Sequence, residues 1–137
     1  MQTGEHYDAD VLFFFDGRPL ELGLYRTFFD ELCRRFPDAS VKVQKSQISF
    51  SNRHLFTAAS LPVRRKKGWP EHCILVTFGL SRQLLSPRIT VAVEPYPNRW
   101  THHVVVSDPA EIDGELMGWV EEAYAFSQSK GRPGARR

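Results

Sequence analysis

The segment from Lys45 to Arg53 carries the densest group of side chains that could bind a ligand. It combines two cations with hydroxyl and amide side chains around the apolar pair Ile48 and Phe50. Successive side chains of a strand point to opposite faces, so Ser49 is expected on the face opposite that pair. If this face lines a concavity, Lys45, Ser49 and Arg53 could hold a carboxylate or phosphate, the arginine as a bidentate fork and the lysine as a point charge. The alternative is that these residues line a solvated sheet face.

A second group, Trp100, His102 and His103, lies at the start of another predicted strand. Alternation sends the two histidines to opposite faces, so they cannot bind one metal ion together, and no metal site is predicted. His102 shares a face with Trp100 and two valines, where a histidine is usually hydrogen-bonded and structural. His103 could join the face that carries Lys45 and Ser49 if the strands lie close together.

Four consecutive cations, Arg64, Arg65, Lys66 and Lys67, are followed closely by Trp69. An aromatic side chain beside cations is typical of sites that hold single-stranded nucleic acid, by stacking on bases and by contact with phosphates. Subtracting these four cations and four more after residue 129 from the net charge of +2 leaves the rest of the chain at −6. A basic surface would therefore be confined to this loop and the C-terminal segment. The alternative is that the loop charges are only solvated.

Familiar catalytic patterns do not occur in the sequence: GxSxG, HExxH, GxxxxGK and GxGxxG are all missing. The enzyme hypothesis left open uses His102 or His103 as a general base near Lys45 or Tyr124. It depends on geometry, because a catalytic constellation is recognised by the placement of its side chains. The domain is therefore expected to be non-enzymatic, and no cofactor is predicted.

The spacing of apolar residues predicts helices at both ends of the chain around a run of strands. A short helix is expected over residues 8–15, and a longer one begins at Pro19 and ends before Pro37. Connections between the strands are too short for crossover helices, so four or five strands in an antiparallel meander are expected. A first strand region begins at Ser40 and reaches Phe50, and the further strands are residues 54–63, 72–79, 88–94 and 101–107.

The last helix has the clearest start signal. Asp108 is a suitable cap, Pro109 fits the first helical position, and Glu111 stands where a capping box closes. We expect this helix to pack on one face of the sheet, giving an α+β fold whose other face is open. Residues 1–128 are predicted to form a single α+β domain, followed by a flexible basic tail over residues 129–137.

Composition limits the class of protein. With 137 residues, 42% of them hydrophobic, the chain can build one core, and no apolar run approaches the roughly 18 residues of a membrane helix. The start of the chain lacks the pattern of a secretory signal, and Cys33 and Cys73 suggest no disulfide framework, so a cytoplasmic location is predicted. A homodimer is also expected, because four phenylalanines present more aromatic surface than one helix face can bury. They are Phe13, Phe14, Phe28 and Phe29.

Five short motifs follow one another along the chain. They are Phe14 to Pro19 leading into Leu24-Tyr25, Val43 to Phe50, Leu55-Phe56, Trp100 to Val104, and Leu116 to Tyr124. In order and spacing they resemble the bacterial domain of unknown function 5655 family, over roughly Val11 to Tyr124. The resemblance implies the α+β fold and carries over no catalytic residue. Because that family occurs alone or at the end of larger proteins, it also implies a ligand-sensing or interaction module. The loop from Arg64 to Trp69 looks longer and more basic than the family's pattern.

Two functions follow from these observations. The first is a non-enzymatic module that binds a small anionic ligand or a protein partner in a pocket with polar groups over an apolar floor. Its predicted site residues are Lys45, Ser49, Arg53, Trp100, His102 and His103. The alternative is a nucleic-acid-associated accessory domain that uses residues 64–67 and the basic tail.

Overall fold

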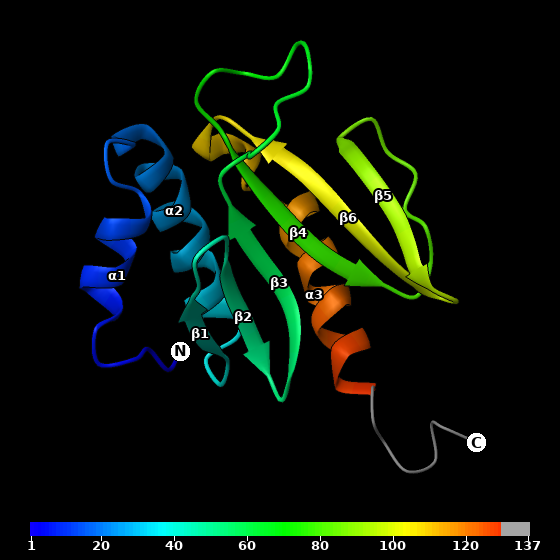
Figure 1. The fold of residues 1–137 in the computed structure, drawn as a ribbon. Coiled ribbons are helices and arrows are strands. Elements are labelled where there is room, and N and C mark those ends of the chain that lie inside the picture. Colours follow the sequence, from blue (N-terminus) through cyan, green and yellow to red (C-terminus); the bar gives the residue numbers. More distant parts are fainter. Residues whose placement is uncertain (130–137) are drawn as a thin grey trace.

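Helices and a single antiparallel sheet make up the computed structural model, which describes residues 1–129 (Figure 1). The α+β class predicted from the sequence is confirmed. The helices are α1 (Tyr7–Phe14), α2 (Pro19–Arg35) and α3 (Gly114–Ser129), with a short 3-10 turn, η1 (Pro109–Glu111). The strands are β1 (Ser40–Val43), β2 (Ile48–Asn52), β3 (His54–Ser60), β4 (Ile74–Leu80), β5 (Ile89–Tyr96) and β6 (Arg99–Val106).

The sheet has six strands in the order β1-β2-β3-β4-β6-β5, so the predicted count of four or five strands is wrong. The region from Ser40 to Phe50 forms two strands, because the Gln44 N–H donates to the Gln47 carbonyl and closes a hairpin turn. No Gly, Pro or Asn-Gly pair marks that turn in the sequence. The predicted meander holds only from β1 to β4, since β5 forms the far edge and β6 returns between β4 and β5.

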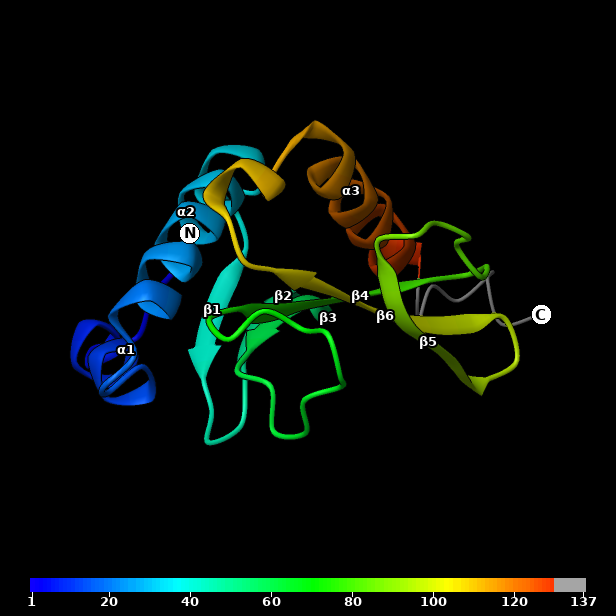
Figure 2. The same cartoon turned by 90° about the horizontal axis from the view of Figure 1, so that it is seen from above.

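Cross-strand rows alternate between the two faces of the sheet. One row joins Phe50, Thr57, Phe78 and His102, and its side chains are buried. Figure 2 shows α2 and α3 on that side of the sheet and the loop between β3 and β4 on the other side. The neighbouring row belongs to the open face, and it runs through Lys42, Ser49, Ala58, Thr77 and His103.

Aromatic packing attaches α2 to the sheet. Pro19 occupies the start of α2. A backbone N–H at this position would have no partner within the helix, so proline costs no hydrogen bond there. Tyr25, Phe28 and Phe29 then place their rings 6.0–6.4 Å from the ring of Phe50 on β2. Such ring pairs stabilise a core beyond the burial of their area, by about 0.5–1.5 kcal/mol each. Phe50 is therefore the main contact between helix and sheet.

A bulge in β3 brings α3 into the same core. Phe50 pairs with Thr57 and Ser51 pairs with Leu55, so Phe56 is left without a partner in the ladder and is buried beside Thr57. The Phe56 ring lies 5.0 Å from the ring of Tyr124 on α3. Nearer the start of α3, the Trp119 ring stacks on Phe78 of β4, with 6.0 Å between the ring centroids. These contacts hold α3 against β3 and β4.

The capping box at Asp108 forms, but it starts a different element from the one predicted. It caps the short turn η1, and the chain breaks at Ile112 before α3 begins at Gly114. Asp113 is the second cap, since its Oδ1 accepts the Leu116 N–H at 3.0 Å. Because α3 continues to Ser129, that residue belongs to the helix, and the remaining residues of the predicted basic tail lie outside the part that the structure describes.

No helix within residues 1–129 is both long and apolar enough to cross a membrane. Of the four phenylalanines behind the expected homodimer, Phe28 lies in the core and Phe14 and Phe29 are half-buried. Only Phe13 is largely exposed, at 84%. The homodimer stays a prediction.

Replacing Phe50 with alanine should lower the free energy of unfolding by about 3–5 kcal/mol, because it removes the ring against which α2 packs. Urea denaturation at pH 7 measures this loss. Phe13→Ala is the control and should change the free energy of unfolding by less than about 0.5 kcal/mol, since that ring is exposed. Equal losses for the two variants would contradict the assignment of Phe50 to the centre of the core.

Candidate functional site

The hairpin between β1 and β2 is held by a buried serine. The Ser49 hydroxyl donates to Gln44 Oε1 at 2.5 Å and accepts from Gln47 Nε2 at 2.8 Å. Both glutamines belong to the turn, so this network fixes the turn against β2. Ser49 lies on the face predicted from alternation, but its hydroxyl is already occupied by the hairpin's own side chains.

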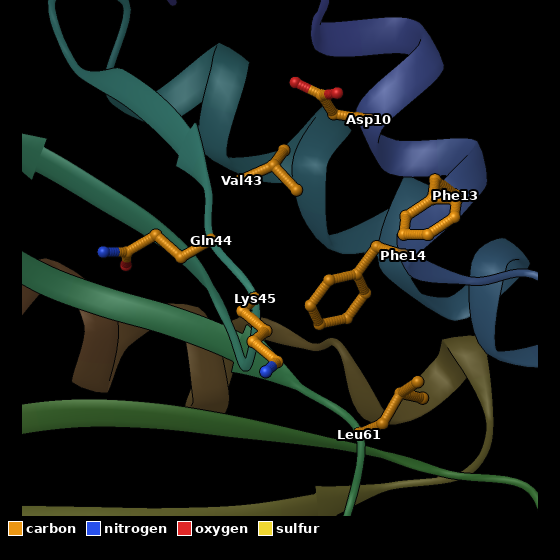
Figure 3. A pocket seen from close by; sticks show the side chains of 7 residues that line it. All are labelled: Asp10, Phe13, Phe14, Val43, Gln44, Lys45 and Leu61. Atoms are coloured by element: carbon orange, nitrogen blue, oxygen red, sulfur yellow. The ribbon is translucent and has the colours of Figure 1, made fainter.

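A pocket of about 430 Å³ lies between this hairpin and α1 (Figure 3). We call it the Lys45 pocket. Residues from α1, from the hairpin and from the chain just after β3 line it. They are Asp10, Phe13, Phe14, Val43, Gln44, Lys45 and Leu61. Figure 3 shows the Phe14 ring directed into the space between Lys45 and Leu61.

The Lys45 pocket combines four apolar side chains with Asp10, Gln44 and Lys45, and its charges stand apart. Within residues 1–129, neither Lys45 nor Asp10 forms an ion pair. The Phe14 ring is supported by an edge contact with Phe15, at 4.9 Å between centroids, and Phe15 is buried. The pocket therefore offers an aromatic wall and an ammonium group that forms no ion pair in the described chain.

Arg53 does not reach this pocket. It occupies the turn between β2 and β3, where its φ of 69° is the left-handed conformation that such a tight turn requires. Lys45 precedes β2 and Arg53 follows it, so the two cations stand at opposite ends of the strand. The structure therefore does not bring Lys45, Ser49 and Arg53 together around one anion.

The two histidines lie on opposite faces, as alternation predicts. His102 is completely buried, stacks on Phe78 at 5.2 Å between centroids, and accepts the Leu84 N–H at Nε2 over 2.9 Å. Burial lowers its pKa, because the charged form would lose its hydration. Trp100 is on the same strand face and half-buried. Both residues are thus separated from the open face by the sheet itself.

His103 stands on the open face, and its Nδ1 lies 2.8 Å from Thr77 Oγ1. Burial lowers the pKa of His103, and the charge of Lys66 lowers it further. His103 and Ser49 share one cross-strand row, but β3 and β4 lie between them. At about 4.8 Å per strand, three steps separate the two residues by about 14 Å. One small ligand cannot contact both.

The basic loop leaves β3 on the open-face side of the sheet (Figure 2). Its four cations are exposed, and Trp69 is half-buried. Arg65 folds back and donates to the Pro70 carbonyl. Arg64, Lys66 and Lys67 form no ion pair within the described chain, and Lys66 lies close enough to His103 to affect its pKa.

The general-base hypothesis requires His102 or His103 near Lys45 or Tyr124, and no hydrogen bond within residues 1–129 joins such a pair. Tyr124 accepts the Asn52 side-chain N–H at 2.7 Å, and His102 Nε2 already accepts from the backbone. No group of three or more His, Cys, Asp or Glu side chains among residues 1–129 could hold a metal ion.

A buried carboxylate, Glu21, was missed by the sequence analysis. It is 1% exposed and lies next to His72. A signal was present, because Glu21 precedes Leu24, Tyr25 and Phe28 by three, four and seven residues and so falls on the apolar stripe of α2. An acid on such a stripe predicts a buried charge.

A family model described as Domain of unknown function (DUF5655) matches residues 16–127. The chain belongs to this family. The DUF5655 segment includes the hairpin with Lys45 and the basic loop, whereas Asp10, Phe13 and Phe14 of the pocket wall precede it. Comparisons with curated proteins and with solved structures give no match.

Acid should destabilise this DUF5655 domain through His102. Its pKa in the folded state is lowered from 6.5, so below about pH 6.5 the unfolded chain binds the proton more readily and stability is lost as the pH falls. His102→Gln should therefore lose less free energy of unfolding between pH 7.5 and pH 5 than the native chain in urea titrations. His54 is exposed, so His54→Gln is the control and should keep the native pH dependence of stability. An unchanged pH dependence in His102→Gln would contradict this account.

Proposed function

We propose that this domain is a non-enzymatic binding module whose Lys45 pocket takes a small anionic ligand with an apolar body. The observation that carries the proposal is an ammonium group that forms no ion pair in the described chain, beside an aromatic-walled hollow. Lys45 would bind the anion, and the apolar part would lie against Phe14, Val43 and Leu61. Of the six residues predicted for this function, the proposal keeps Lys45 as the ligand contact.

The dimensions and lining of the pocket agree with this role. Its volume of about 430 Å³ falls in the usual range for small-molecule sites, about 300–1,000 Å³. Apolar walls provide most of the affinity for such ligands, and a few polar groups fix their orientation. Lys45 is a flexible point charge, which suits a carboxylate, a phosphate or a sulfonate equally well.

Preorganisation of the hairpin supports the proposal. Ser49 ties Gln44 and Gln47 to each other, so the turn that presents Lys45 is ordered before a ligand arrives. A site that is already ordered loses less conformational entropy on binding. Ser49 is thus assigned a positioning role in place of the ligand contact expected from the sequence.

Asp10 gives the pocket a polarity. It lines the α1 side, and Lys45 lines the hairpin side. An anionic group near Asp10 would be repelled, so a ligand should bind with its acid group toward the hairpin. Comparing the affinities of anionic, neutral and cationic analogues therefore tests the charge preference of the pocket directly.

Three probes of one shape test the site: benzoate, benzamide and benzylammonium. NMR titration should show the tightest binding for benzoate, with dissociation constants of about millimolar size for ligands this small. Lys45→Gln should weaken benzoate about ten-fold, because a hydrogen bond to a charged group is lost, and leave benzamide unchanged. Phe14→Ala should weaken both.

The matched control is Lys42→Gln. Lys42 is an exposed cation on β1 that belongs to the open face and does not line the pocket. It should change benzoate affinity by less than about two-fold, since exposed charges at a distance are screened by salt. Equal weakening by the two lysine variants would mean that net charge, and not this site, binds the anion.

A second candidate function is nucleic-acid association through the basic loop. The observation that favours it is that the loop lies on the open-face side of the sheet with its four cations exposed (Figure 2), where the charge of Lys66 also lowers the pKa of His103. Arg64, Lys66 and Lys67 are the cations available to phosphates, because Arg65 is engaged with Pro70. Trp69 could add base stacking.

Fluorescence anisotropy with short single-stranded and double-stranded DNA tests this candidate. Binding should weaken steeply as salt rises, because phosphate contacts release counterions. A Lys66→Gln, Lys67→Gln double variant should bind more weakly at low salt and show a shallower salt dependence. Absence of binding by the native chain at low salt removes the candidate.

A further inference from the structure

Glu21 is a buried acid whose pairing is incomplete. In the first turn of α2 it is 1% exposed, and among residues 1–129 its Oε1 has no hydrogen-bond partner. Its Oε2 lies 3.2 Å from His72 Nδ1, and the Arg18 guanidinium is 3.9 Å away. A buried carboxylate is costly unless it is fully hydrogen-bonded. Such groups are therefore concentrated at functional sites.

This contact leaves one nitrogen of His72 for a ligand. An ionised carboxylate only accepts hydrogen bonds. When His72 is neutral, its Nδ1 therefore carries the proton and donates a hydrogen bond to Glu21 Oε2. Nε2 then keeps a lone pair. Its charged neighbour Glu71 has Oε2 at 3.9 Å, which is beyond hydrogen-bonding distance. Glu21 thus acts as a positioning residue that holds Nε2 as an acceptor.

His72 lines a second pocket, of about 300 Å³, which we call the Gly23 pocket. Its other lining residues are Pro19, Leu20, Gly23, Leu24, Ser107 and Pro109. Ser107 Oγ donates to Glu111 Oε1 at 3.3 Å, so the serine oxygen offers only its lone pairs to a ligand. The pocket therefore has aliphatic walls and two hydrogen-bond acceptors.

A glycine inside α2 forms part of the wall of this pocket. Glycine in a helix interior costs about 1 kcal/mol relative to alanine. At Gly23 the backbone is not in the left-handed region, and an added Cβ would have no atom within 4 Å. Neither the backbone nor crowding requires glycine there. The absent side chain leaves open space at the pocket wall.

We propose that the Gly23 pocket binds the ammonium group of a small primary amine. The amine N–H groups would donate to His72 Nε2 and Ser107 Oγ, and the organic part would lie against Leu20, Leu24 and the two prolines. Three carboxylates lie nearby, Glu21 behind His72 and Glu71 and Glu111 near the acceptors, and the Arg18 guanidinium beside Glu21 offsets only one of them. Cations are favoured in such a field.

NMR titration with benzylammonium, benzyl alcohol and benzoate tests this site. The ammonium should bind most tightly and shift the amides of residues 19–24 and of His72. Gly23→Leu should lower benzylammonium affinity at least ten-fold, because the new side chain fills the pocket. Gly118→Leu is the matched control, since Gly118 is also a helical glycine whose added Cβ would have no neighbour, and it lies in α3 outside the pocket. Equal affinity in the two variants, or tighter binding of benzoate at these residues, overturns the proposal.

Three further variants separate this site from the Lys45 pocket and from a purely structural role. Lys45→Gln should leave benzylammonium binding unchanged, so failure of the anion site does not affect this test. His72→Gln should weaken benzylammonium several-fold. Glu21→Gln should weaken it as well and should change the His72 tautomer seen in long-range proton–nitrogen spectra. Retention of the Nδ1–H tautomer with native affinity in Glu21→Gln would contradict the positioning role.

Discussion

The packing of α2 against Phe50 is the contact on which both pockets depend. Phe50 projects from the helix-covered face of β2 and meets three rings of α2. α1 is joined to α2 in turn, because the hydroxyl groups of Tyr7 and Tyr25 share a hydrogen bond of 2.6 Å. This contact is sheltered from water, and burial raises the pKa of Tyr7 to about 12. The position of α1 beside the hairpin, and hence the Lys45 pocket, follows from this chain of contacts. The same anchoring places the start of α2, with Glu21 and Gly23, beside His72.

The two pockets have opposite electrostatic character. The Lys45 pocket presents an exposed lysine that forms no ion pair in the described chain, whereas the Gly23 pocket presents acceptors backed by a buried acid. Apolar side chains contribute to both pockets, so charge is what would distinguish their ligands.

The sequence predicted the elements better than their connections. Helical spacing located α1 and α2, and alternation assigned His102 and His103 to opposite faces. The turn at Gln44–Gln47 was missed because it is fixed by the Ser49 side chain and not by a turn dipeptide. The late insertion of β6 between β4 and β5 depends on long-range pairing, which local periodicity does not report. Likewise, Lys45 and Arg53 are only eight positions apart, yet the extended strand β2 between them places the two cations at opposite ends of the strand. The Glu21 signal was visible on the helix stripe, but its partner His72 lies 51 residues away in the sequence.

The central claim is that an anion binds at Lys45 in the pocket between α1 and the hairpin. A crystal structure of the chain soaked with benzoate tests it most directly. We expect the carboxylate beside the Lys45 ammonium and the ring against Phe14 and Leu61. Benzoate at Arg53 or on the open sheet face, with the Lys45 pocket empty, would contradict the account.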